Sequence, residues 1–287
     1  MPTMARQLRD LILNNPPVVA PGAFDGLSAR LVEQAGFAAV YATGGGIARS
    51  TGVPDLGLMS LDEIVHRLEE MVDATTIPLI ADADTGHGNA LNARKTARAF
   101  ERAGVAGFHL EDQVFPKKCG HYDDKSIVPQ KEMTQKIRAV KDALHDPDMV
   151  LIARTDGLAV EGYEPTIERA HAYMDAGADA IFVEAPTSEE QIEQIAKDLP
   201  QPKLINMFHG GKTPLMPADR LGELGYSLII IPSDTQRAAI KGMQDTLEAI
   251  RRDGHSAAMQ ERMVTFKGRE EVIGTDAYNA LDKKYGV

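Results

Sequence analysis

Three acidic residues stand at the ends of two consecutive apolar runs of strand length. Asp82 and Asp84 end one run, and Glu111 ends the next. Alternate residues of a strand point to the same side, so Asp82 and Asp84 are expected to face together. Converging carboxylates repel one another unless protons or a cation intervene. The pattern favours a divalent metal site, and the alternative is that the two aspartates cap the helix expected to start near Asn89.

The chemical type of its ligands indicates which metal this site would prefer. The carboxylates are not accompanied by a cysteine–histidine cluster. Such hard ligands suit Mg²⁺, or Mn²⁺, better than Zn²⁺. We therefore expect Mg²⁺ as the cofactor, with Mn²⁺ as a substitute.

The only cysteine of the chain, Cys119, lies in a Lys-Lys-Cys-Gly-His sequence at residues 117–121. Cationic neighbours favour the thiolate over the thiol, and an adjacent glycine lets the backbone approach a ligand closely. A single cysteine cannot form an internal disulfide, so it could pack, bind metal or transfer a proton. A charged loop disfavours packing, and the carboxylates already supply a metal site. We therefore favour proton transfer.

Polar residues at other strand ends add two further candidates. The glycines at residues 44–46 could bring backbone N–H groups onto a carboxylate or phosphate, although taken alone they are explained better by a tight turn after the strand. Arg154 needs an anionic partner if it is buried. A substrate carboxylate and Glu184 are equal candidates for that partner. His109 lies within an apolar run, which is more typical of a core histidine than of a catalyst.

Eight apolar runs predict the fold that would position these residues. The runs are continuous rather than alternating, as in parallel strands buried on both faces. Eight such strands predict an α/β fold, a TIM-type (β/α)8 barrel spanning residues 1–287 as one domain. An open doubly wound sheet is disfavoured because no GxGxxG sequence follows the first run. The runs occupy residues 18–20, 38–42, 77–81, 107–110, 150–153, 180–183, 203–205 and 228–231.

Amphipathic stretches between the runs predict helices. Ser60 and Glu63 form a capping box at the start of one of them. An eighth helix is expected over residues 236–252, followed by a helical extension from about residue 253. Active sites of such barrels lie at the carboxyl ends of the strands, so the polar residues should meet there. The other predicted helices cover residues 61–72, 90–102, 131–144, 166–176 and 189–197.

Charge and hydropathy exclude several classes of partner. The net charge of −11 argues against nucleic acid or an anionic membrane as a partner. A small anionic substrate is still compatible, because a bound cation can invert the local field. No apolar run reaches the length of a membrane span, and no signal peptide precedes the first run. With one unpaired cysteine, this favours the cytoplasm.

Taken together, these motifs resemble the isocitrate lyase/phosphoenolpyruvate mutase superfamily. The cysteine loop resembles the lyase branch, since the mutases and phosphonopyruvate hydrolases of the superfamily lack this cysteine. The chain looks most like 2-methylisocitrate lyases, 2,3-dimethylmalate lyases and oxaloacetate hydrolases. The matching segments are residues 41–46, 54–57, 82–86, 109–113, 117–121 and 153–156, with Glu184, Asn206 and Arg237 further on.

The resemblance implies a Mg²⁺-dependent lyase that cleaves a C–C bond of a 2-hydroxy di- or tricarboxylate. The products would be a 2-oxo acid and a second carboxylate. It also implies a barrel whose eighth helix is swapped between subunits of a homotetramer. By the same resemblance, Asp82 and Asp84 would bind the metal directly or through water, and Asp55 and Glu111 would hold metal-bound waters.

The resemblance also assigns roles to the remaining residues. Tyr41 would be the base that removes the hydroxyl proton, and Cys119 the acid that protonates the carbon. One substrate carboxylate would be held by Thr43, Gly44 and Gly45. The negative charge formed on cleavage would be held by Gly120, His121, Arg154, Glu184 and Asn206.

Two departures from the family pattern concern substrate identity. His209 stands where much of the group has an acid, and residues 233–237 replace the commoner run before Arg237. Three alternative functions stay open at this point. They are oxaloacetate hydrolysis or decarboxylation at the same site, a zinc-dependent aldolase reaction, and metabolite binding without turnover.

Overall fold

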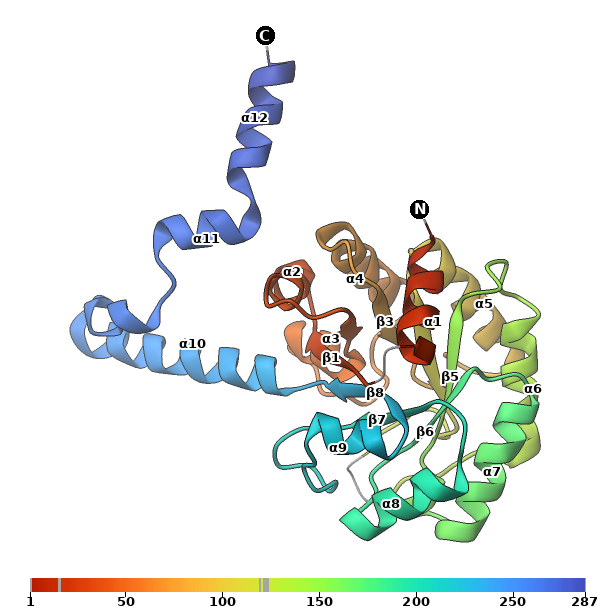
Figure 1. Ribbon diagram of the computed structural model, residues 1–287. Helices are drawn as coiled ribbons and strands as arrows, with labels where there is room; N and C mark the ends of the chain where they lie inside the picture. Colours follow the sequence, from red (N-terminus) through yellow and green to blue (C-terminus); the bar gives the residue numbers. More distant parts are fainter. Residues whose placement is uncertain (1, 15–16, 119, 121–123, 287) are drawn as a thin grey trace. The chain divides into compact units, whose positions relative to one another are not determined.

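The computed structural model describes residues 2–14, 17–118, 120 and 124–286. Its eight parallel strands close into a barrel in sequence order, β1 to β8 (Figure 1). This confirms the predicted (β/α)8 fold and all eight strands. The strands are β1 (Val18–Ala23), β2 (Val40–Ala42), β3 (Leu79–Asp82), β4 (Gly107–Glu111), β5 (Val150–Thr155), β6 (Ala180–Val183), β7 (Lys203–Asn206) and β8 (Tyr226–Ile231).

The strands are buried on both faces because helices cover the barrel outside and side chains fill it inside. All six residues of β5 are buried, for example. Alternate strand residues such as Ile80, Ile152 and Phe182 form one interior cluster. Leu8 and Ile12 of the N-terminal helix belong to the same cluster. The interior is therefore a packed core rather than a pore.

Helices follow the strands around the barrel (Figure 1). The five predicted between strands are confirmed, and the predicted Ser60–Glu63 capping box starts α4. The helices of this part are α1 (Met4–Asn14), α2 (Gly26–Gln34), α3 (Gly44–Ser50), α4 (Leu61–Ala74), α5 (Ala90–Arg102), α6 (Gln130–Lys141), α7 (Tyr163–Asp175), α8 (Glu189–Asp198) and α9 (Ala218–Glu223).

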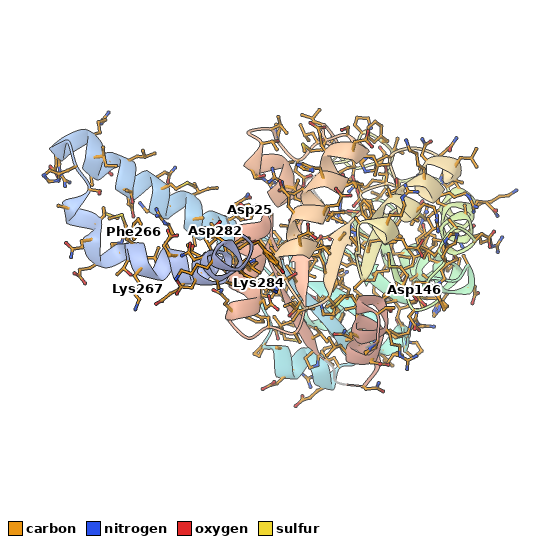
Figure 2. All side chains as sticks on the ribbon, turned by 90° about the horizontal axis from the view of Figure 1, so that it is seen from above. Asp25, Asp146, Phe266, Lys267, Asp282 and Lys284 are labelled. Atoms are coloured by element: carbon orange, nitrogen blue, oxygen red, sulfur yellow. The ribbon has the colours of Figure 1, made fainter. Side chains whose placement is uncertain are left out.

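By its internal contacts, the chain divides into two compact units, Met1–Asp234 and Thr235–Val287. The first unit holds the barrel. The second consists of helices, and the eighth predicted helix is confirmed as α10 (Asp234–Asp253). It continues through a short 3₁₀ helix (Ala257–Arg262), α11 (Phe266–Ile273) and α12 (Thr275–Tyr285). Figure 2 labels Phe266 and Lys267 at the start of α11, and Asp282 and Lys284 towards the end of α12.

Among the residues that the structure describes, no helix has the length and apolar character needed to cross a bilayer.

Candidate active site

The alternation of strand residues aims one set of polar side chains into the barrel mouth. On β5, Arg154 has the same parity as the interior residues Val150 and Ile152. The same rule places Asp82 after Ile80 on β3, and Asn206 after Leu204 on β7. Side chains of equal parity share a face. The mouth is therefore lined by polar groups that stand directly on the apolar core.

Arg154 is the centre of a buried charge cluster. Its guanidinium lies 3.0 Å from Asp156 Oδ2, 3.2 Å from Glu111 Oε2 and 3.5 Å from Glu184 Oε2. Burial alone would lower the pKa of Arg154, but these carboxylates raise it well above its usual value. Glu184 is therefore one partner, as expected, while Asp156 and Glu111 lie closer. The arginine carries a fixed positive charge into the mouth.

Asp156 is the anion that keeps this arginine in place. It accepts hydrogen bonds from Arg154 Nε (3.0 Å) and from the ammonium of Lys125 (2.6 Å). Burial would raise its pKa, but the two cations lower the pKa to about 2. Asp112, the residue directly after β4, accepts from Thr155 Oγ1 and the Asp156 N–H and lies behind the site. Asp112 therefore supports the cluster rather than facing ligand.

The carboxylates expected to hold a metal do converge, but not by strand alternation alone. Asp82 is the last residue of β3, whereas Asp84 lies beyond the strand with a φ of 47°. The Asp84 N–H donates to Asp82 Oδ1 at 3.0 Å, which closes a tight turn. Lys117 pairs with Asp84 Oδ1 at 2.8 Å and also with Asp55. A turn and a lysine thus bring three aspartates to one place.

The pKa values of the two central aspartates diverge. For Asp82, burial is outweighed by the charges of His109, Lys117 and Arg154, and the pKa falls to about 2. For Asp84, burial and the neighbouring Asp82 outweigh Lys117, and the pKa rises to about 6. Asp82 is therefore the more strongly ionised of the pair.

Glu111 supplies an observation on whether this site fits a cation. Its side chain is buried, and Oε1 has no hydrogen-bond partner among the described residues. Burial, with Asp156 and Asp84 nearby, raises its pKa well above the usual value. A cation would relieve both conditions. The set of hard oxygen donors fits Mg²⁺ or Mn²⁺.

The manner of binding would have to include water. Within the described part of the chain, no three Asp, Glu, His or Cys side chains lie close enough to enclose an ion by themselves. Mg²⁺ usually keeps several water ligands and uses one or two carboxylates. The geometry is compatible with that mode and not with a closed protein cage.

Tyr41 and His109 form a buried pair at the bottom of the mouth. The Tyr41 hydroxyl lies 2.7 Å from His109 Nε2 and 3.5 Å from Asp82 Oδ2. Burial, together with the charge of Asp82, raises the pKa of Tyr41 well above 10. Burial lowers the pKa of His109, whose Nδ1 has no partner among the described residues. His109 is buried in the core, as expected, but it also contacts a site residue, which its apolar neighbours in the sequence concealed.

The glycines at residues 44–46 form the first turn of α3, not the tight turn considered from the sequence. Thr43 caps the helix by accepting from the Gly46 N–H, and its own N–H bonds to Ala23 O. The first N–H groups of a helix lack intrahelical partners. A Cβ on Gly44 would lie 2.7 Å from Asp82 Oδ2. Glycine is thus required where the start of the helix meets Asp82.

Two described residues of the cysteine loop, Lys117 and Gly120, lie at the same mouth. Cys119 and His121 lie outside the described residues, so their predicted roles stay predictions. Gly120 is buried, and a Cβ there would lie 2.7 Å from Glu184 Cγ. Lys117 was considered only as a neighbour of the thiol, and its pairing with Asp55 and Asp84 was missed. Its separation from those aspartates in sequence left no local signal.

The two departures from the family pattern meet in space. The N–H of His209, after β7, donates to Asp234 Oδ2, after β8, at 3.4 Å. Glu184 and Asn206 are both buried at neighbouring strand ends. The hydrogen bond places His209 and Asp234 together, just after β7 and β8.

A family model described as phosphoenolpyruvate phosphomutase matches residues 8–251. The chain is 42% identical over 282 residues to the 2,3-dimethylmalate lyase of Eubacterium barkeri, covering 98% of each protein. It is 41% identical over 280 residues to the 2-methylisocitrate lyase of Bacillus subtilis strain 168, covering 98% of this chain and 92% of the relative.

Solved structures agree with the sequence relatives. A trigonal crystal form of 2,3-dimethylmalate lyase matches with a TM-score of 0.93 at 39% identity, covering 100% of this chain and 96% of that one. Oxaloacetate acetylhydrolase with 3,3-difluorooxalacetate matches with a TM-score of 0.93 at 35% identity, covering 99% and 97%. Phosphonopyruvate hydrolase with oxalate and Mg²⁺ matches with a TM-score of 0.90 at 29% identity, covering 99% of both chains.

Proposed function

The chain belongs to the phosphoenolpyruvate mutase/isocitrate lyase superfamily, and from this premise we propose that it is a Mg²⁺-dependent carbon–carbon lyase. Its substrate would be a 2-hydroxy di- or tricarboxylate of the 2,3-dimethylmalate or 2-methylisocitrate type. The observation that carries the proposal is the convergence of Asp82, Asp84 and Arg154 at one buried barrel mouth. The two aspartates could bind a cation that holds one end of an anionic substrate. Arg154 could bind negative charge at the other end.

Asp82 and Asp84 would hold Mg²⁺ or Mn²⁺ directly or through water, with Asp55 and Glu111 binding its water ligands. The bound ion would offset negative charge on the 2-hydroxy acid end of the substrate. Oε1 of buried Glu111, which has no hydrogen-bond partner in the described part of the chain, supports a cation at this place. Mg²⁺ in the related phosphonopyruvate hydrolase structure supports it independently.

The start of α3 would bind the same end of the substrate. Gly44 and Gly45 would donate their N–H groups to its carboxylate, since these lie in the first helical turn. Thr43 would contribute its hydroxyl, because its N–H is already bonded to Ala23 O. Fixed donors of this kind need no rearrangement as charge develops.

Cleavage begins with loss of the hydroxyl proton, for which Tyr41 would be the base. Because the pKa of Tyr41 is raised by burial, the phenol is protonated at neutral pH. It can accept a proton only as its own passes on, and His109 Nε2 lies 2.7 Å away to receive it. The oxygen electron pair then forms the C=O bond, and the pair of the broken C–C bond moves onto the departing carboxylate fragment.

The departing fragment would be a dianion until its carbon is protonated. Arg154 carries the fixed positive charge that would face it, with Gly120, His121, Glu184 and Asn206 around it. Cys119 would deliver the proton to carbon. The products would be pyruvate and propionate from 2,3-dimethylmalate, or pyruvate and succinate from 2-methylisocitrate.

A second candidate is hydrolysis or decarboxylation of oxaloacetate at the same site. It is favoured by the match to oxaloacetate acetylhydrolase along 99% of the chain. The test is turnover of 2,3-dimethylmalate, 2-methylisocitrate and oxaloacetate by the same preparation, first with EDTA and then with Mg²⁺ or Zn²⁺ restored. Cleavage of a 2-hydroxy acid restored by Mg²⁺ supports the lyase. Turnover of oxaloacetate alone supports the hydrolase, restoration by Zn²⁺ alone an aldolase, and binding without product a non-catalytic barrel.

We further propose that the protein assembles as a homotetramer in which subunits exchange the α10 helix. Ile240, Met243 and Leu247 of α10 recur at helical spacing and are exposed by 41%, 58% and 64%. An apolar stripe on a helix needs a partner surface. Sedimentation velocity should give a species of four chains, and Met243→Glu with Leu247→Glu should dissociate it.

A further inference from the structure

The segment that carries the cysteine loop is closed at its base by a short antiparallel pairing. The Val114 N–H donates to Ser126 O, and the Val128 N–H to Asp112 O, both at 2.8 Å. Gln113 and Ile127 form the bridge between them. The two ends of the segment are therefore fixed side by side, directly beyond β4.

Gln113 holds the main chain on one side of the cysteine. Its buried side-chain amide accepts from the Lys118 N–H and donates to the Lys118 carbonyl, each at 2.9 Å. The side chain of Gln113 thus bonds both the N–H and the carbonyl of Lys118. Glutamate has the same shape but, when ionised, cannot donate. The pairing therefore requires an amide.

Lys125 holds the main chain on the other side. Its ammonium, on a side chain that is 1% exposed, donates to the Gly120 carbonyl and pairs with Asp156 at 2.6 Å. Asp156 also binds Arg154 Nε at 3.0 Å. A buried ammonium needs such an anion. Gly120 is therefore linked to the arginine of the site through Lys125 and Asp156.

We propose that Gln113 and Lys125 are positioning residues, which fix the main chain at Lys118 and at Gly120 on the two sides of Cys119 in the sequence. Cys119 is the residue between these two anchors in the sequence. Neither anchor needs to touch substrate, because each acts through a backbone group. The effect of these two anchors on catalysis rests on the proposed function, in which Cys119 donates a proton. A displacement of about 1 Å at a reacting group can cost about 100-fold in rate.

The first test measures anchoring without relying on activity. Cys119 is the single cysteine, so the rate of iodoacetamide alkylation at pH 9 reports on this residue alone. Gln113→Glu and Lys125→Met should each raise that rate by about fivefold or more, because the flanking main chain is released. The matched controls Gln135→Glu and Lys131→Met, at exposed positions of α6, should leave it unchanged. Rates within twofold of the wild type for both anchor variants would overturn the proposal.

The second test separates positioning from general damage. Gln113→Glu should lower kcat about 10- to 100-fold when Cys119 is present, and less than about twofold in a Cys119→Ser background. Equal losses in both backgrounds would show that Gln113 does not act through the cysteine. Lys125→Met could fail to fold because Asp156 loses a partner. In that case both the alkylation rate and kcat are measured on Gln113→Glu alone. If Cys119→Ser alone keeps full activity, the proposed function fails, while the alkylation result still decides the anchoring.

Discussion

The Lys117 ammonium lies 2.8 Å from Asp84 Oδ1 and also binds Asp55, so a lysine pairs with two of the carboxylates that we propose hold the metal and its waters. Burial would lower the pKa of Lys117, but Asp84, Asp82 and Asp55 raise it well above its usual value. The lysine is therefore a permanent cation at this place. A divalent ion bound as proposed would compete with Lys117 for the same negative charge.

Replacing Lys117 by methionine should tighten metal binding. Removal of a like charge a few ångströms from the ion should lower the dissociation constant for Mn²⁺ by about tenfold. Electron paramagnetic resonance of free Mn²⁺ measures this constant directly. Lys118→Met is the matched control, since the Lys118 ammonium bonds to the Asp124 carbonyl instead. Weaker Mn²⁺ binding by Lys117→Met would show that the lysine supports the ion rather than competing with it.

Gly44→Ala should damage the metal site without unfolding the barrel. The new Cβ would lie 2.7 Å from Asp82 Oδ2, so the carboxylate or the start of α3 must shift. We expect Mn²⁺ binding to weaken by about tenfold or more, and kcat/KM to fall further because the same turn would hold the substrate carboxylate. Ser50→Ala, at the exposed end of the same helix, should change neither. Unaltered Mn²⁺ binding in Gly44→Ala would separate this helix from the metal site.

Tyr41→Phe should lower kcat by about 10²- to 10⁴-fold, the usual cost of losing a general base. Burial raises the pKa of Tyr41 well above 10, so the wild-type enzyme should show no gain in kcat from tyrosine ionisation up to pH 9.5. Stopped-flow or steady-state pH profiles test both statements. Tyr163→Phe is the control, because that hydroxyl bonds to Asp198 instead. A Tyr41→Phe variant that keeps more than a tenth of the activity would assign the base elsewhere.

The fold was predictable because it follows from patterns that are local in sequence. Eight continuous apolar runs can be buried on both faces only in a sheet covered by helices, and all eight form strands. The Ser60–Glu63 capping box spans three residues, so it could be read directly and is confirmed. The short helix α3 could not, because glycine is a poor helix former and this helix owes its start to the Thr43 cap.

The site residues at strand ends could be placed from the sequence, whereas the positions of those in loops could not. Asp82 is the last residue of β3 and Arg154 the last but one of β5, so the alternation of strand side chains placed them in the mouth. Asp84 reaches the site through a left-handed turn, and Lys117 through a pairing with distant Asp55. Such contacts depend on how loops fold back, for which the sequence carries no period. The pairing of His109 with Tyr41 likewise joins two strands and has no local pattern.

Asp156→Asn tests the buried charge cluster through its pH dependence. Loss of the anion leaves Arg154 and Lys125 buried with less compensation, and the free energy of unfolding at pH 7 should fall by about 3 kcal/mol. The folded-state pKa of Asp156 is depressed to about 2, from an ordinary 3.8. Its ionisation therefore stabilises the fold above about pH 4, and this stabilisation is lost as the pH falls towards 2.

The gap between wild type and Asp156→Asn should consequently narrow by about 1 kcal/mol between pH 7 and pH 3. Urea unfolding at one protein concentration measures it. Glu193→Gln, which removes an exposed ion pair with Arg220, should cost less than about 0.5 kcal/mol at each pH. A gap that widens on acidification would mean that Asp156 is not the ionised partner of the two cations.

Carbon–carbon cleavage with protonation of the departing carbon is tested most directly by NMR of the products formed in D₂O with Mg²⁺. The expected result is conversion of 2,3-dimethylmalate to pyruvate and propionate, or of 2-methylisocitrate to pyruvate and succinate. The second product should carry one deuterium at its C2 methylene, and Cys119→Ser should slow its formation about 10²- to 10⁴-fold. Neither acid being cleaved, while oxaloacetate is consumed under the same conditions, would contradict the lyase assignment.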